Sequence, residues 1–349
     1  MRHNPDDIER LYGTEQGDRL NRWVMGSADL VFNLARRHAI DCDATQNGWI
    51  SPAHRPSRLG VVRAKYEQWA KRGAPVDLLD RQATAALVGS EHYHGAWVHR
   101  AGGHIQPLNF ARGLATAAIK AGAQVHGKTP ATHLTRDAAG WRVATPQGAI
   151  TADSVILATN AYTDRLWPSL KATVIPVRSF HVATAPLGAN VRRSILPMGH
   201  GLSDTRQALW AFRFDRDGRL VMTAMPFLTM GVRGGLLRST LGRLATLFPQ
   251  LETPEIEHLW DGKVAMTVDR LPHYHALAPG VHAGLGYNGR GIALGTAMGK
   301  LMAERALGRI SDQALPIPAT PLKPLTLHDA IVPLARIMVP VYRWRDKYL

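Results

Sequence analysis

Three glycines near the C-terminal end of the chain have the spacing of a nucleotide-binding turn. Residues 284–292 read Gly-Leu-Gly-Tyr-Asn-Gly-Arg-Gly-Ile, so that Gly284, Gly286 and Gly289 satisfy the pattern G-x-G-x-x-G. Glycine at these positions lets the backbone approach a phosphate, and a following helix presents its positive end to the anion. The spacing therefore indicates contact with a nucleotide cofactor.

The surroundings of this glycine motif differ from those of a dinucleotide-binding βαβ unit. Such a unit needs a second strand after the helix and an acidic residue about 20 positions further on. Here the predicted helix ends near Gly308, a proline-rich tail follows, and Glu304 lies inside the helix. The small residues Gly295, Ala297 and Gly299 also fit a helix that merely packs closely on a strand. The residues alone leave both interpretations open.

Other groups match known chemical sites less well. Residues 92–94 and 273–275 each read His-Tyr-His, but without thiolate or well-spaced carboxylate partners we expect turn or surface histidines and no metal. The single cysteine, Cys42, lies between two aspartates that would raise the pKa of its thiol, which favours a structural role. A G-x-S-x-G elbow and a complete P-loop are both absent, which excludes hydrolases and P-loop nucleotide-binding proteins of the usual kind.

The composition is that of a globular protein with a large core. The chain has 349 residues, of which 45% are hydrophobic and 20% charged, enough for two domains. Lys and Arg number 42 against 27 Asp and Glu, but these basic residues are scattered and form no nucleic-acid-binding motif. We expect a basic surface and no specific nucleic-acid site, with an anionic-surface or nucleic-acid binder as the weakest alternative.

The sequence also predicts a compartment. Its first residues are polar, and no apolar run approaches the length of about 18 residues that a membrane span requires. One cysteine allows no internal disulfide, which is typical of a reducing compartment. We therefore expect a cytoplasmic protein without a membrane span.

Secondary-structure signals place the glycine motif between a strand and a helix. Asn4-Pro5 followed by two aspartates predicts a helix start, with helical spacing as far as His38. Further helices are predicted over 59–71, 80–88, 107–121 and 235–247, and from the glycine motif to about 307. Strands are predicted over 76–79, 122–125, 131–136, 141–145, 149–156, 174–184, 208–214, 220–223, 255–266 and 282–285.

A second candidate ligand contact stands where an apolar strand ends. Residues 155–163 read Val-Ile-Leu-Ala-Thr-Asn-Ala-Tyr-Thr, so that small and polar residues follow the apolar run directly. A strand that ends in such residues can bring its backbone very close to a ligand. The alternative is an ordinary strand terminus.

Four segments in a fixed order now carry a family resemblance. They are Gly-Gly-His-Ile-Gln-Pro at 102–107, the strand end at 156–163, Thr-Val-Asp-Arg-Leu-Pro at 267–272 and the glycine motif at 286–292. In this order and at this spacing they resemble the D-amino-acid-oxidase-like superfamily of FAD-dependent oxidoreductases. Within it the chain is most similar to amine oxidoreductases of the γ-glutamylputrescine and glycine type, over nearly its whole length.

The resemblance implies an α+β fold, in which a mainly antiparallel β substrate domain interrupts an α/β FAD-binding domain. The FAD-binding domain is expected at 1–45, 100–165 and 275–310, the substrate domain at 46–99 and 166–274, and a C-terminal tail at 311–349. In this family an N-terminal βαβ unit with G-x-G-x-x-G holds the pyrophosphate of FAD. Only a few polar residues precede the first predicted helix, so we expect the FAD-binding domain to be incomplete at its N-terminus. A misplaced start codon, a gene fragment and a truncated protein with a changed role are all open explanations.

The resemblance also implies the cofactor, FAD, and its contacts. These are expected at Ala131, Ala158, Thr159, Asn160, Gly286, Tyr287, Asn288, Gly289, Arg290, Gly291 and Ile292. The reaction would oxidise the C–N bond of a small-molecule amine by hydride transfer to flavin N5, and the positive end of the helix would stabilise the negative charge of the reduced ring. Tyr287 and Arg290 are the candidates on the substrate side. No catalytic acid or base and no oligomeric state are assigned.

One departure from the family concerns the substrate. Several N-methyl amino acid oxidases of the superfamily carry a lysine just after the last glycine segment, where it pairs with the substrate carboxylate. Here that position is Ala293. The resemblance therefore favours longer amines, such as γ-glutamylputrescine, over small α-amino acids. The alternative to an enzyme is a truncated, non-enzymatic remnant or ligand-binding module of the same fold.

Overall fold

The computed structural model describes residues 3–138, 140–208, 210–224, 232–335, 341 and 344–346. The chain forms two compact units, each assembled from separate stretches. Unit 1 comprises Met1–His38, Ala111–Val177 and Lys263–Pro333, and unit 2 comprises Ala39–Phe110, Arg178–Gly262 and Leu334–Leu349. Both units contain helices and sheets, which confirms the predicted α+β class.

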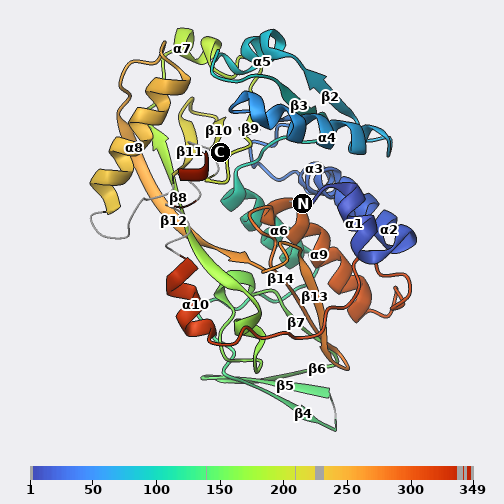
Figure 1. Ribbon diagram of the computed structural model, residues 1–349. Coiled ribbons are helices and arrows are strands. Elements are labelled where there is room, and N and C mark those ends of the chain that lie inside the picture. The colour runs from blue at the N-terminus through green and yellow to red at the C-terminus, as the bar shows by residue number, and fades with distance from the viewer. Residues whose placement is uncertain are drawn as a thin grey trace. The chain divides into compact units, whose positions relative to one another are not determined.

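Unit 1 contains a three-stranded sheet in the order β13–β14–β7 (Figure 1). The central strand β14 (Val281–Leu285) runs parallel to β7 (Val155–Leu157) and antiparallel to β13 (His273–Ala278). All residues of β14 are buried, and α9 (Gly291–Ala306) packs against this strand and against α3 (Ser27–Arg37). The glycine motif therefore lies at a strand-to-helix junction, as the sequence predicts.

The other elements of unit 1 surround this sheet or extend from it. An antiparallel meander consists of β4 (His133–Asp137), β5 (Gly140–Thr145) and β6 (Gly148–Ala152). The helices are α1 (Pro5–Tyr12), α2 (Thr14–Met25), most of α6 (Pro107–Lys120) and α10 (His328–Ala335), with 3-10 turns at Asn160–Tyr162 and Leu170–Thr173.

Three expectations for unit 1 are wrong. The helix expected to reach His38 is divided at Gly13, whose φ of +79° ends the first segment, and again at Gly26. Residues 122–125 form turn and irregular backbone rather than a strand. The residues around His275 form strand β13, with this ring 1% exposed, and are not a surface turn.

Unit 2 is built on an eight-stranded sheet that is mostly antiparallel, with β1 and β9 parallel. In spatial order the strands are β12 (Ile256–Met266), β8 (Ile175–Thr184), β11 (Leu220–Ala224), β10 (Ala211–Phe214), β9 (Gly201–Ser203), β1 (Trp49–Pro52), β3 (Ala96–His99) and β2 (Val76–Leu79). Its helices are α4 (Leu59–Ala70), α5 (Arg81–Val88), α7 (Ala189–Ser194) and α8 (Val232–Leu247), with a 3-10 turn at Pro56–Arg58.

Strand register gives the sheet of unit 2 two different faces, because successive side chains in a strand point to opposite sides. The core face carries Ile50, Val98, Phe180, Val182, Leu202, Phe212 and Met222, which pack in one apolar cluster with Leu244 and Phe248. The opposite face, which we call the polar face, carries Trp49, Ser51, Trp97, His99, His181, Ser203, Arg213 and Thr223, together with the apolar residues Ala183, Ala211 and Val221. Hydrophobic burial therefore explains one face of this sheet and leaves the other to be explained.

Candidate functional site

The glycine motif divides into a buried half and an exposed half. A Cβ atom at Gly284 would lie 2.4 Å from Cγ of Met298, and one at Gly286 would lie 2.4 Å from Cγ2 of Thr267. Gly286 also has a φ of +78°, a conformation that side chains disfavour. Gly289 has a φ of +85°, but a Cβ there would meet nothing within 4 Å. The backbone at Gly289 thus borders open space, while the first two glycines serve packing inside unit 1.

Asn288 holds the loop together from within. Its side chain is 4% exposed, and its backbone has a φ of +52°. The Oδ1 atom accepts the N–H of Thr267 at 3.0 Å, and Nδ2 donates to Oγ1 of Thr267 and to the carbonyls of Gly286 and Leu271. Every polar atom of this side chain is satisfied by protein groups. Asn288 therefore shapes the loop through its side chain and leaves no side-chain donor for a ligand.

Asn160 connects the two segments in which the sequence predicts ligand contacts. Its Oδ1 accepts the N–H of Gly286 at 3.0 Å, and its φ of +46° turns the chain sharply after β7. Just before it, Ala158 and Thr159 are exposed. Since β7 and β14 are parallel neighbours, their carboxyl ends meet at one edge of the sheet, where ligands of open α/β sheets bind.

The exposed half of the loop forms the N-terminus of α9. Gly289, Arg290, Gly291 and Ile292 are all exposed, and Arg290 is the N-cap residue. The first backbone N–H groups of a helix have no helical partner, and they carry a partial positive charge. This end of α9 is therefore able to donate hydrogen bonds to an anionic or carbonyl-bearing ring.

The two residues predicted to lie on the substrate side, Tyr287 and Arg290, have different environments. The tyrosine ring packs over α9, with its Cε2 atom 3.5 Å from the position of a Cβ on Gly295. Burial raises the pKa of its hydroxyl above the usual range. The structure thus places the Tyr287 ring against the helix and Arg290 at the exposed helix start.

Ala131, the remaining predicted contact, lines a basic pocket of unit 1. The pocket has a volume of about 940 Å³ and lies between residues 130–135 and the segment that follows Asn160. Arg165, Lys171 and Lys263 line it with one acid, Asp164, and Lys171 also lies 3.8 Å from Asp329. Nζ of Lys263 lies 5.3 Å from the ring centre of Tyr162. Such a positively charged concavity suits a phosphate-bearing ligand. Together with the open backbone at Gly289 and the exposed helix start, it fits the expected FAD.

Unit 2 holds a buried charged cluster that the sequence did not indicate. Arg206 forms an ion pair with the fully buried carboxylate of Asp204, and its guanidinium lies 3.7 Å from the ring centre of Trp210. Burial raises the pKa of Asp204 to about 6 despite the neighbouring arginine. Nη2 of Arg206 donates to Nε2 of His92 at 2.8 Å, and burial, followed by this charge, lowers the pKa of His92 to about 4. Because its members are paired with one another, the cluster serves the structure of unit 2.

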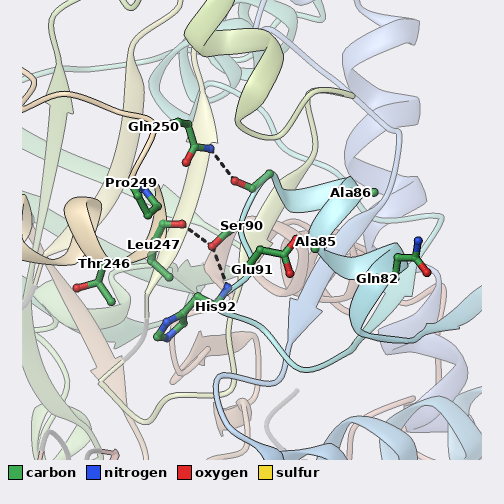
Figure 2. Close-up of a pocket in the computed structure, with 11 residues that line it drawn as sticks. Gln82, Ala85, Ala86, Ser90, Glu91, His92, Thr246, Leu247, Pro249 and Gln250 are labelled. Atoms are coloured by element: carbon green, nitrogen blue, oxygen red, sulfur yellow. Dashed lines mark hydrogen bonds between the residues drawn. The ribbon is translucent and has the colours of Figure 1, made fainter.

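A pocket of about 700 Å³ lies beside His92, between α5 and the end of α8 (Figure 2). Its polar groups are largely paired with one another. Ser90 donates to the carbonyl of Leu247, and Nε2 of Gln250 donates to the carbonyl of Gly89 at 2.7 Å. These bonds join the two helix ends, so the pocket presents few free polar groups to a ligand.

Two further groups take no part in the candidate site. Cys42 is 1% exposed, and burial together with Asp43 and Asp41 raises the pKa of its thiol, as predicted for a structural cysteine. In the part of the chain that the structure describes, no three His, Cys, Asp or Glu side chains are grouped to hold a metal. Within the same residues, no helix combines the length and the apolar character needed to cross a bilayer.

Known proteins share both the sequence pattern and the fold. A family model described as FAD dependent oxidoreductase matches residues 5–305. The chain is 33% identical to the probable oxidoreductase OrdL of Rhizobium meliloti (strain 1021) over 322 residues, which cover 90% of this chain and 74% of the relative. It is 29% identical to the γ-glutamylputrescine oxidoreductase of Escherichia coli (strain K12) over 305 residues, which cover 87% of this chain and 71% of that protein.

Two solved structures show the same fold. A glycine oxidase from Geobacillus kaustophilus aligns with a TM-score of 0.69 at 22% identity, over 83% of this chain and 78% of the other. An L-proline dehydrogenase from P. horikoshii aligns with a TM-score of 0.71 at 17% identity, over 89% and 85% of the two chains. At these identities the likeness concerns the arrangement of helices and strands.

Proposed function

Because the chain belongs to the family of FAD-dependent oxidoreductases, we propose that it oxidises the C–N bond of a small-molecule amine. The resemblance inferred from the sequence and the predicted cofactor, FAD, are confirmed at the level of this family. Amine oxidation is supported by relatives named for it and by the site in unit 1.

The proposal rests on the exposed N-terminus of α9, because hydrogen bonds from buried side chains fix the loop that precedes it. Asn288 fixes the loop, and Asn160 fixes the N–H of Gly286. The groups proposed to hold FAD are the backbone of Gly289 to Ile292, the strand end at Ala158 to Asn160, and the backbone of Ala131. Tyr287 and Asn288 are assigned to the same site through the packing that shapes it.

When bound, FAD supplies the acceptor for the hydride that leaves the carbon next to the amine nitrogen. The contribution of the chain is electrostatic and steric. N–H groups at the helix start and the charge of Arg290 stabilise added negative charge at a fixed position, at no cost of reorganisation. Gly289 and Gly291 leave that position free of side chains. A protein base is not required, provided that the amine arrives in its neutral form.

We further propose that the substrate is a long amine of the γ-glutamylputrescine kind. A relative with 29% identity carries that name, and Ala293 stands where small-amino-acid oxidases of the superfamily have a carboxylate-binding lysine. Ala293 is an apolar residue of the first turn of α9 and offers no charge to a substrate.

The test is to reconstitute the purified full-length chain with FAD and to add amines without oxygen. We expect uptake of FAD and bleaching of its absorbance by γ-glutamylputrescine, with little or no bleaching by glycine. A protein that takes up FAD but bleaches with no amine would be a ligand-binding module, the alternative predicted from sequence. A protein that takes up no FAD would contradict the proposal entirely.

A further inference from the structure

The glycine loop and the strand end of unit 1 leave the diphosphate of FAD without an anchor. The sequence contains a single G-x-G-x-x-G, and its first two glycines, Gly284 and Gly286, are packed so closely that a Cβ at either would lie 2.4 Å from a neighbouring side chain. Gly289 borders open space, but the helix start that follows it is proposed to face the flavin ring. Phosphate groups in proteins are bound by backbone N–H groups or by Arg and Lys. The diphosphate therefore calls for cations elsewhere in unit 1.

The basic pocket of unit 1 offers cations that protein groups do not neutralise. Arg165, Lys171 and Lys263 line this pocket. Lys171 has a partner in Asp329 at 3.8 Å, but in the residues that the structure describes neither Arg165 nor Lys263 belongs to an ion pair. The acid that lines the pocket, Asp164, already accepts a backbone N–H group at 3.0 Å. The pocket therefore keeps a net positive charge.

Tyr162 forms an aromatic wall of the same pocket, with its side chain 64% exposed. Its hydroxyl accepts the backbone N–H of Lys263 at 3.3 Å, and its ring centre lies 5.3 Å from Nζ of that lysine. The turn that carries the tyrosine is also fixed. The N–H of Tyr162 donates to the carbonyl of Thr159 at 2.9 Å, and the hydroxyl of Thr163 donates to the carbonyl of Asn160 at 2.8 Å. One aromatic ring and one cation are thus held together by segments distant in the sequence.

The remaining surface of the pocket is largely apolar. Ala161 and Val174, both buried, line it together with Pro168 and Pro176. The volume of about 940 Å³ lies within the range of about 300–1,000 Å³ that is common for small-molecule sites. Apolar and aromatic groups suit a purine, and unpaired cations suit a diphosphate. The combination matches adenosine diphosphate, the half of FAD that does not carry the flavin.

We propose that this pocket binds the adenosine diphosphate half of FAD, with the diphosphate held by Arg165 and Lys263. A guanidinium binds two phosphate oxygens at once, whereas an ammonium group acts as a point charge. Lys171 contributes less, because Asp329 shares its charge. The inference rests on the proposed function for the identity of the dinucleotide. It gives two side chains the role that a glycine-lined helix start has in dinucleotide-binding βαβ units.

The test measures how the full-length protein binds FAD, ADP and adenosine, with flavin fluorescence for FAD and competition against FAD for the other two. Wild-type protein should bind ADP about tenfold or more tightly than adenosine, and ADP should displace FAD. Arg165→Gln should weaken the binding of FAD and of ADP about tenfold, and Lys263→Gln about three- to tenfold. Both variants should bind adenosine as the wild type does, because adenosine carries no phosphate.

Two further variants separate the diphosphate contact from general charge. Arg165→Lys keeps the charge without the paired donors and should retain part of the affinity. Arg22→Gln removes an exposed charge on α2 that does not line the pocket, and it should leave the affinity for ADP unchanged. Added salt should weaken ADP binding more in the wild type than in Arg165→Gln, because salt screens exposed charges. Since Arg165 and Lys263 are both exposed, the melting temperatures of their variants should equal that of the wild type.

Several results would overturn the assignment. These are equal binding of ADP and adenosine by the wild type, ADP binding that does not compete with FAD, and an unchanged FAD affinity when Arg165→Gln and Lys263→Gln are combined. If that double variant still took up FAD and an amine bleached it, the proposed oxidation would stand without this pocket. FAD that is bound through these cations but bleached by no amine would leave the assignment standing and contradict only the proposed reaction.

Discussion

The glycine loop of unit 1 and the polar face of unit 2 are built in opposite ways. The loop is one continuous stretch, residues 284–292, and it offers a ligand mainly backbone N–H groups and the end of a helix. The polar face offers side chains, and these come from separate strands aligned by register. In the loop, the residues that would contact a ligand are therefore also the residues that determine how the backbone folds. On the polar face, a side chain can be substituted while the backbone pairing of the strands remains.

This difference predicts how each region responds to substitution. Changes in the buried half of the loop should unfold the surrounding unit before they alter binding selectively. Changes of single side chains on the polar face should cost little stability, because the backbone pairing of the strands remains. The contrast fails if loop variants fold normally or if polar-face variants unfold.

The largest effect is expected at Gly286. Alanine there would combine a φ of +78° with a Cβ atom 2.4 Å from Thr267. We expect Gly286→Ala to lower the free energy of unfolding by about 3 kcal/mol or more. Gly289 has a similar φ of +85° but open space in front of it, so Gly289→Ala should cost about 1 kcal/mol while weakening FAD binding. Urea denaturation and FAD titration measure the two quantities.

A third glycine gives the control for this pair. Gly299 lies within α9, and a Cβ there would meet nothing within 4 Å. Gly299→Ala should raise stability slightly, by about 0.5–1 kcal/mol, because alanine favours the helix, and it should leave FAD binding unchanged. Equal losses for Gly286→Ala and Gly289→Ala would show that φ alone matters and that the buried half has no special packing.

The same contrast explains what could be predicted from the sequence. The glycine spacing and the strand end at Asn160 are local patterns, and each indicates a ligand contact from a few consecutive residues. The sequence did not show that Asn160 and Asn288 hold other segments in place. That Asn288 bonds to Thr267, and Asn160 to Gly286, depends on segments distant in sequence. A local pattern shows which residues lie near a ligand, but not which of them hold the others in place.

Arg213 could not be found from the sequence, because its importance depends on strand register. It became notable only when β10 placed it opposite the core face and left its charge without an ion pair among the described residues. The prediction that His275 lies in a surface turn was wrong for a related reason. Its histidine–tyrosine pattern favours a turn, but pairing of β13 with β14 buries it, and its Nδ1 bonds to the carbonyl of Thr320 at 2.6 Å. Strand pairing decided the surroundings of both residues, and it depends on segments that are distant in the sequence.

A medium effect is expected from the two asparagines that organise the loop. Asn288→Ala leaves the N–H of Thr267 and the carbonyl of Gly286 without the buried amide that pairs with them, whereas the carbonyl of Leu271 keeps the hydroxyl of Thr267, and the change should cost about 2–3 kcal/mol. Asn160→Ala releases only the N–H of Gly286 and should cost about 1 kcal/mol. Both should weaken FAD binding, which equilibrium titration of the folded protein measures.

Asn33→Ala is the matched control for these variants, since Asn33 lies exposed on α3 and its side chain accepts a hydrogen bond from Arg36 on the same helix. It should change neither quantity. If Asn288→Ala folded as stably as the wild type but lost FAD affinity, then Asn288 would contact the cofactor directly. The loop would in that case resemble the polar face after all.

The smallest effect concerns pH and separates the two regions by their chemistry. Burial, with a further contribution from the charge of Arg213, lowers the pKa of His181 and of His104 below the usual 6.5. Below pH 6.5 the folded protein therefore binds fewer protons on these rings than the unfolded chain does. The contribution of these rings to the free energy of unfolding should be constant above pH 6.5 and fall as the pH drops below that value.

The expected loss is at most about 1 kcal/mol for each ring between about pH 7 and 5.5, measured by urea denaturation at each pH. His181→Gln should remove the part of this loss that belongs to its ring, because glutamine takes up no proton in this range. FAD binding should not follow the same curve. Its predicted contacts on the glycine loop are backbone groups, the permanently charged Arg290, and Tyr287, whose pKa is raised by burial. If His181→Gln lost as much stability on acidification as the wild type, then the His181 ring would accept a proton in the folded protein as readily as in the unfolded chain, and the polar face would be open to water at that ring.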